Sequence, residues 1–114
     1  MPAGSLGVHM TVPEITVDEL ADALERGGRV VDVREPAEFD EARVPGAALV
    51  PLATVPQHID SFHGEGTTYV ICRSGGRSMQ ACQFLAEHGA DVANVAGGTL
   101  AWIASGRDVA SGPA

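Results

Sequence analysis

The chain has 114 residues, which at about 100–200 residues per domain is enough for one domain. Hydrophobic residues make up 45% and charged residues 19%, a composition that argues against an intrinsically disordered protein. The 15 acidic and 7 basic residues give a net charge of −8, the wrong sign for binding nucleic acid or an anionic membrane surface. The two cysteines are too few for a disulfide scaffold and lack zinc-ligand spacing. We therefore expect free thiols, no metal or other cofactor, and a cytoplasmic location.

Three segments are expected along the chain. Residues 1–12 are predicted to be a flexible leader, and they lack the basic and apolar regions of a signal peptide. Residues 13–110 form the predicted domain, and 111–114 a short tail. No apolar run approaches the roughly 20 residues of a membrane-spanning helix, so no membrane association is expected.

Within the domain, amphipathic segments alternate with short β-branched runs. Thr16 and Glu19 have the spacing of a capping box at the start of the first helix. The expected elements, in chain order, are helix 17–26, strand 29–33, helical turn 36–41, strand 47–50, helix 56–62, strand 67–71, helix 78–88, strand 91–95 and helix 99–106. Strand–helix alternation implies right-handed crossovers, and hence a three-layer α/β domain whose mostly parallel sheet of about five strands carries helices on both faces.

Cys72 lies where a predicted strand runs through a tight loop into a helix. In open α/β sheets this is the edge at which ligands bind. The loop N–H groups and the helix N-terminus would point toward the sulfur and lower the thiol pKa from about 8.5 toward neutrality or below. The thiolate is the reactive form, so the arrangement predicts a nucleophile.

The residues that follow Cys72 support an anion site. Gly75 and Gly76 can adopt the positive φ that a loop with inward N–H groups requires. Arg73 and Arg77 add positive charge, and Arg77 could bind an anionic substrate with its two-pronged guanidinium or tie down loop carbonyls. No Asp or Glu occurs from 66 to 86, although the whole chain is acidic. A small anion could therefore be attracted locally.

Other conspicuous side chains are interpreted as structural. Cys82 lies on the apolar stripe of the predicted helix 78–88, and we expect it to pack in the core. Trp102 is likewise expected in the core. The four histidines have no ligand spacing and are expected at the surface or at helix ends.

Four ordered segments together resemble the motifs of single-domain rhodaneses, the thiosulfate sulfurtransferases. They are the active-site loop at 72–78, the amino-terminal signature at 31–39, the Val-Pro-Gly-Ala turn at 44–48 and the carboxyl-terminal signature at 97–106. The resemblance covers about residues 13–110. One departure is Ala42-Arg43, where many members carry Gly-His.

The resemblance implies a rhodanese-like domain and a covalent mechanism. Cys72 would take a sulfane sulfur from thiosulfate, release sulfite and become a persulfide. It would then pass the sulfur to cyanide or to a thiol acceptor, such as thioredoxin or a sulfur-carrier protein. The residues expected to bind the donor are Arg73, Ser74, Gly75, Gly76, Arg77 and Ser78. In support, we expect Asp32 to orient the loop by hydrogen bonds, and Arg34 to pair with Glu35 or Glu38.

Two alternative functions remain open. Cysteine-dependent phosphatases and arsenate reductases also use a thiolate ringed by N–H groups, but their loops resemble Cys-x5-Arg, whereas Cys72 to Arg77 is Cys-x4-Arg. The shorter loop suits one sulfur atom better than a tetrahedral phosphate. The other alternative is a non-catalytic rhodanese-like module that binds or senses sulfur, although such members generally lack the cysteine.

Overall fold

The computed structural model describes residues 11–113, so most of the expected leader lies outside the described residues. Five strands form one sheet in the order β2-β6-β5-β3-β4, and every neighbouring pair is parallel. The strands are β2 (Glu14–Ile15), β3 (Arg29–Asp32), β4 (Ala48–Leu49), β5 (Thr68–Ile71) and β6 (Val92–Val95). The predicted α/β class and parallel sheet are confirmed.

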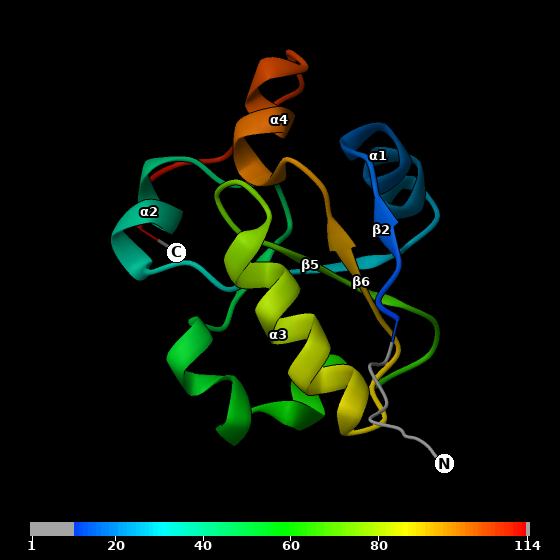
Figure 1. Cartoon of the computed structure of the whole chain (residues 1–114). Helices are drawn as coiled ribbons and strands as arrows, with labels where there is room; N and C mark the ends of the chain where they lie inside the picture. Colours follow the sequence, from blue (N-terminus) through cyan, green and yellow to red (C-terminus); the bar gives the residue numbers. More distant parts are fainter. Residues whose placement is uncertain (1–10, 114) are drawn as a thin grey trace.

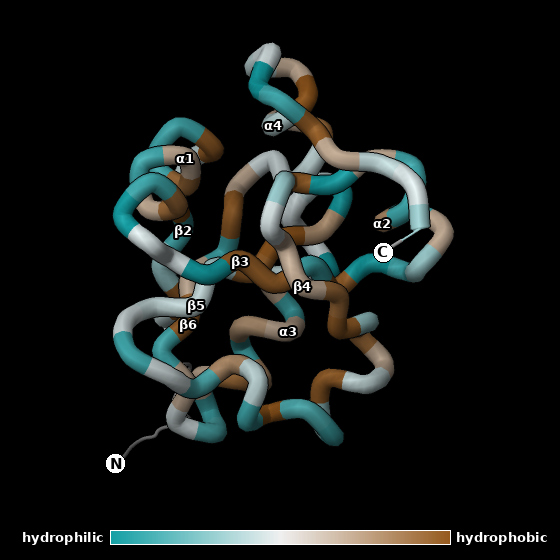
Figure 2. Tube along the Cα trace, turned by 180° about the vertical axis from the view of Figure 1, so that it is seen from behind, coloured by the Kyte–Doolittle hydropathy of each residue, from teal (hydrophilic) through white to brown (hydrophobic). Residues whose placement is uncertain are grey.

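Helices cover both faces of the sheet (Figure 1). They are α1 (Val17–Glu25), α2 (Pro36–Glu41), α3 (Gly76–Glu87) and α4 (Gly98–Ala104), with two 3-10 helices at Leu52–Gln57 and Ile59–Phe62. One core cluster includes Val70 and Phe62 and the buried face of α3. The other joins Leu20 of α1 and Trp102 of α4 to strand residues such as Ile71. Figure 2 shows hydrophobic strand segments at the centre of the trace, with hydrophilic turns around them.

Several local predictions are confirmed. Thr16 and Glu19 form the capping box, each accepting a hydrogen bond from the other's backbone N–H, at 3.1 and 2.9 Å. Cys82 is fully buried, and Trp102 is 5% exposed, with its indole N–H donating to the carbonyl of Asp108. His58, His63 and His88 are exposed, whereas His9 lies outside the described residues.

Three elements differ from expectation. The segment expected as helix 56–62 forms the two 3-10 helices, and Pro56, which has no N–H to donate, lies inside the first of them. The two-residue edge strand β2 was not predicted. Helix α3 begins at Gly76, two residues before the predicted start.

Arg43 holds the end of the chain against α2. Its Nη1 donates to the carbonyls of Phe39 and Gly112, at 3.1 and 2.8 Å, and its backbone pairs with Ala110. The N–H of Gly112 in turn donates to the carbonyl of Asp40 at 2.7 Å. At the position where this turn departs from the rhodanese pattern, the arginine therefore attaches the start of the expected tail to the domain.

Within residues 11–113, no helix is both long enough and apolar enough to cross a bilayer. The same part of the chain contains no group of three or more His, Cys, Asp or Glu side chains arranged to hold a metal ion.

Candidate active site

Cys72 lies at the carboxyl end of β5, with strands on both sides of it. Its sulfur accepts a hydrogen bond from the backbone N–H of Gly75 at 3.1 Å and another from the hydroxyl of Ser78 at 3.2 Å. Cys72 is 1% exposed, and Ser78 is fully buried. The sulfur thus lies between the loop and the first turn of α3, where donors can stabilise a negative charge.

The pKa values of the two cysteines are shifted in opposite directions. Burial raises the pKa of Cys72, but hydrogen bonds from Ser78, Gly75 and Ser74 outweigh it and bring the pKa below that of an ordinary thiol. Burial raises the pKa of Cys82 to about 12, and the nearby charges of Cys72 and Glu14 add to this rise. Cys72 is therefore the thiol of this protein that is prepared to react as a thiolate.

Gly75 gives the loop its shape. Its φ of +114° lies in the left-handed region, which glycine adopts without a steric penalty, and its conformation aims the N–H at the sulfur. The carbonyl of Gly75 accepts hydrogen bonds from the Ser78 hydroxyl, the Met79 N–H and the side-chain amide of Asn94. The carbonyl and the N–H of this residue are thus both held in place.

Asn94 is a site residue that the sequence analysis missed. It is fully buried in β6, and its amide nitrogen donates to Gly75 at 3.1 Å and to the carboxylate of Glu14 at 2.9 Å. Its own carbonyl oxygen has no partner among the described residues. The available signal was a polar amide within an otherwise apolar strand, and buried amides are normally kept in place by specific hydrogen bonds.

The opposite side of the loop rests on the start of α4. The N–H and hydroxyl of Thr99 donate to the carbonyl of Cys72 at 2.8 and 2.9 Å, and the N–H of Leu100 donates to the carbonyl of Arg73 at 3.1 Å. A Cβ atom at Gly98 would come within 2.6 Å of both carbonyl oxygens. This helix can therefore support the loop only with glycine at its first position.

Substitution of Gly98 by alanine is expected to be more damaging than the same change at Gly106. Both glycines have a left-handed φ, so alanine costs about 1–2 kcal/mol at either position. Only Gly98→Ala adds a clash with backbone, worth about 1–3 kcal/mol more. Urea unfolding of both variants measures this difference. Equal losses would show that the close contact at Gly98 is relieved without cost.

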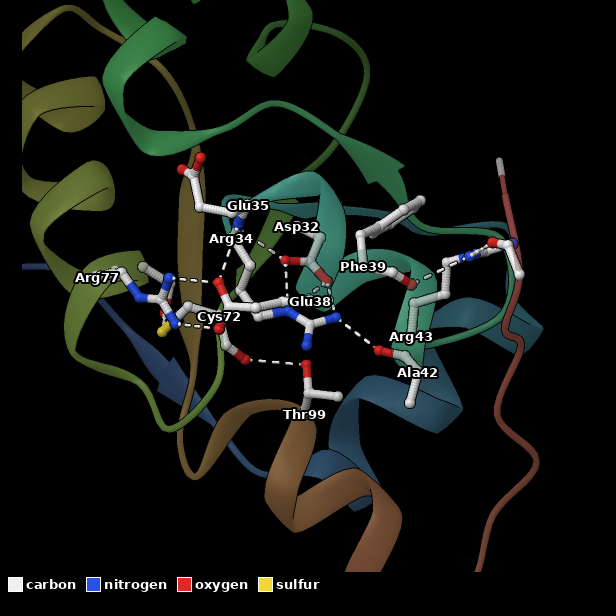
Figure 3. Close-up of polar contacts among 12 residues, drawn as sticks. Asp32, Arg34, Glu35, Glu38, Phe39, Ala42, Arg43, Cys72, Arg77 and Thr99 are labelled. Atoms are coloured by element: carbon white, nitrogen blue, oxygen red, sulfur yellow. Dashed lines mark hydrogen bonds and ion pairs between the residues drawn. The ribbon is translucent and has the colours of Figure 1, made fainter.

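Arg77 forms a two-pronged ion pair with Glu38 of α2 (Figure 3). Its two terminal nitrogens lie 2.8 and 2.9 Å from the two carboxylate oxygens. The hydrogen bond from Arg77 lowers the pKa of Glu38 to about 2, despite an opposing effect of burial. Both terminal nitrogens of Arg77 are used on Glu38, so this guanidinium does not tie down the loop carbonyls as one expectation had it. The expected contact of Arg77 with an anionic substrate stays a prediction, and such a contact has to compete with Glu38.

The supporting pair differs from what the sequence analysis expected. Arg34 binds Asp32, with its Nη2 2.8 Å from the carboxylate, and pairs with neither Glu35 nor Glu38. Asp32 is fully buried and its carboxylate bonds to Arg34 rather than to the Cys72 loop. Burial explains why Arg34 pairs with Asp32, because a buried guanidinium needs a counter-ion that is also buried. Arg34 then reaches the carbonyl of Ala42 at 2.7 Å, and so connects β3 to the end of α2.

The remaining loop residues face solvent. Arg73, Ser74 and Gly76 are exposed, and Gly75 and Arg77 are half-buried. Arg73 forms no side-chain hydrogen bond or ion pair with the described residues. The loop therefore presents its backbone and one unpaired cation to solvent, around a sulfur that lies beneath them.

Replacing Ser78 by alanine is expected to raise the pKa of Cys72. The variant loses the hydroxyl that donates to the sulfur, and a hydrogen bond to a charged group corresponds to about one to two pH units. The rate of iodoacetamide alkylation increases as the thiol ionises, so its midpoint should move to higher pH. Ser74→Ala is the matched control, since Ser74 acts through its backbone N–H, which alanine keeps. A midpoint unchanged in Ser78→Ala would contradict this account of the pKa.

Comparisons with known proteins agree with this geometry. The rhodanese-like domain family matches residues 16–105. The chain belongs to this family. A sulfurtransferase of Allochromatium vinosum is 35% identical over 81 residues, covering 70% of this chain and 76% of that protein. The relatedness predicted from the four motifs is therefore confirmed.

The fold is also similar to those of solved rhodanese-like structures. A rhodanese-like domain protein from Staphylococcus aureus has a TM-score of 0.75 at 35% identity, covering 80% of this chain and 91% of that one. A rhodanese-related protein from Thermoplasma volcanium has a TM-score of 0.80 at 28% identity, covering 86% and 97%. The predicted fold class is thus confirmed by independent structures.

Proposed function

We propose that this rhodanese-like protein is a sulfurtransferase that moves a sulfane sulfur, from thiosulfate or a related donor, to cyanide or a thiol acceptor. The observation that carries the proposal is the environment of the Cys72 sulfur, which receives hydrogen bonds from the loop and from Ser78 at the start of α3. These bonds lower the pKa of Cys72, so no separate general base is required. The sulfurtransferase relative supports the same chemistry.

The reaction consists of two displacements at sulfur. The Cys72 thiolate attacks the outer sulfur of thiosulfate, a new S–S bond forms, and sulfite leaves with the electron pair of the broken S–S bond. In the second step the acceptor attacks the outer sulfur of the Cys72 persulfide, and the Cys72 thiolate is released. The N–H groups of loop residues 73–77 would stabilise the charge on the bound sulfur in both resting forms, and the hydroxyl of Ser78 would do the same.

The site speaks against the phosphatase alternative. A phosphatase needs its loop arginine free to bind the oxyanion of the substrate. In this protein both terminal nitrogens of Arg77 already bind the carboxylate of Glu38. The Cys-x4-Arg loop is also one residue shorter than the phosphatase pattern. Hydrolysis of para-nitrophenyl phosphate that disappears in Cys72→Ser would nevertheless establish phosphatase chemistry.

The second displacement requires an acceptor that can attack the outer sulfur of the Cys72 persulfide. We propose a small or protein-borne thiol, such as thioredoxin or a sulfur-carrier protein, as the partner that attacks the persulfide. Cyanide serves as an assay acceptor. A reducing compartment such as the cytoplasm would keep Cys72 and Cys82 as the free thiols that the structure contains.

Steady-state kinetics test the covalent route. With thiosulfate and cyanide varied against each other, a persulfide intermediate predicts parallel double-reciprocal lines, because sulfite leaves before the acceptor reacts. Intersecting lines would indicate that donor and acceptor are bound together, and would contradict the two-displacement mechanism.

A further inference from the structure

The ion pair between Glu38 and Arg77 places a carboxylate beside the reactive loop and neutralises the positive charge of Arg77. Glu38 uses both carboxylate oxygens on Arg77, and one of them also accepts the backbone N–H of Glu35 at 3.1 Å. The carboxylate is therefore held by contacts within α2 as well as by the arginine. With a pKa of about 2, it stays ionised throughout the range in which Cys72 reacts.

This arrangement changes what the loop offers an incoming donor. Arg77 lies close enough to Cys72 for their charges to interact. The hydrogen bond and charge of Glu38 raise the pKa of Arg77 most, and the charge of Cys72 raises it to a smaller extent. Its two-pronged face, which would recognise an oxyanion, is already occupied. A dianion such as thiosulfate must displace Glu38 or approach next to its charge, and like charges brought together in this way discriminate between partners.

The surroundings of Glu38 suit a different donor. A cavity of about 150 Å³ lies beside the loop, between α2 and α4. Its walls include Glu38, Glu41 and Arg73, together with Leu100 and Ile103, two large apolar side chains that are each 44% exposed. These apolar walls can contact an organic group, which thiosulfate does not have.

We propose that Glu38 is a specificity-determining residue, which disfavours dianionic donors such as thiosulfate and favours persulfides of small organic thiols. The inference rests on the proposed sulfurtransferase function. The Cys72 thiolate attacks the outer sulfur of R–S–SH, a Cys72–sulfur bond forms as the donor S–S bond breaks, and the thiolate R–S⁻ leaves with the electron pair. The proton stays on the transferred sulfur, so no other reactant is needed.

Glu38→Gln is the variant that separates charge from structure. Glutamine keeps an oxygen that can accept from Glu35 and Arg77, and is as suitable as glutamate at this position of a capping box. Glu87→Gln is the matched control. Glu87 lies at the opposite end of α3 from Arg77, it is exposed, and it forms no ion pair with the described residues.

The experiment measures sulfur transfer from two donors to each protein. The donors are thiosulfate and the persulfide of N-acetylcysteamine, whose organic group is uncharged. For Glu38→Gln, kcat/KM is expected to rise roughly tenfold with thiosulfate and to change less than about twofold with the persulfide. Glu87→Gln is expected to leave both donors within about twofold of the wild type.

The outcomes separate this inference from the function on which it rests. No change or a fall with thiosulfate in Glu38→Gln would overturn the role of Glu38, as would an equal rise in Glu87→Gln. A parallel loss with both donors would show that Glu38 only supports the loop, and would also overturn it. If the wild type took sulfur from neither donor, the sulfurtransferase function itself would fail.

Discussion

Serine at position 72 is expected to reduce sulfur transfer roughly 1,000-fold or more, the scale of loss seen when a covalent nucleophile is removed. The hydroxyl can still accept from Gly75 and Ser78, so the loop should keep its conformation. An alcohol does not ionise at neutral pH and cannot hold a sulfane sulfur as a persulfide. Rates with thiosulfate and cyanide, measured on the wild type and the Cys72→Ser variant, give the ratio directly.

Cys82→Ala is the control for this loss. Cys82 is equally buried, but its pKa is raised to about 12, so it stays a thiol and packs within the core. Its replacement should leave the transfer rate close to that of the wild type. If turnover survived in Cys72→Ser but disappeared in Cys82→Ala, the nucleophile would be Cys82 and not Cys72.

Alanine at Asp32 is expected to lower the free energy of unfolding by about 3–5 kcal/mol, because it leaves the charge of Arg34 buried and unpaired. Asp32 is fully buried and Arg34 is 5% exposed, and the carboxylate accepts four hydrogen bonds from this one residue. Urea denaturation of the variant measures the loss. Adding Arg34→Met should restore part of it by removing the unpaired charge.

An exposed ion pair provides the matched control. Asp18 lies 2.8 Å from Arg107, but its side chain is 78% exposed. Asp18→Ala is expected to cost at most about 1 kcal/mol, since solvent screens such pairs. If Asp32→Ala were no more destabilising than Asp18→Ala, the buried pair would not be the support of β3 and α2 inferred from the structure.

Local patterns in the sequence were sufficient for the fold class and for the position of Cys72 at the carboxyl end of a strand. The capping box at Thr16 and the β-branched runs depend on interactions between residues only a few positions apart. The same interactions are present in the folded chain, so these patterns predict local structure well. Of the two glycines considered for a positive φ, Gly75 has one and aims its N–H at the sulfur, whereas Gly76 has none and begins α3. These features predict Cys72 at the carboxyl edge of the sheet, where it lies in the structure.

The partners of the loop could not be predicted in the same way. Glu38 and Arg77 are 39 residues apart, Asn94 is 19 residues from Gly75, and Thr99 is 27 residues from Cys72. Each contact depends on how two segments far apart in the sequence pack together at the sheet edge, and periodicity within one segment gives no information on that. The pairing of Arg34 was missed for a different reason, because Asp32, Glu35 and Glu38 were all near in sequence and only burial distinguishes Asp32 from the other two.

The most direct measurement is the intact mass of the protein after incubation with a sulfane-sulfur donor, under non-reducing conditions. Thiosulfate and a thiol persulfide should both be used, followed by removal of excess donor and fragmentation of the labelled peptide. The account predicts that the wild type gains the mass of one sulfur atom on Cys72, and that Cys72→Ser gains none. A wild-type mass unchanged by every donor, or an equal gain in Cys72→Ser, would contradict it.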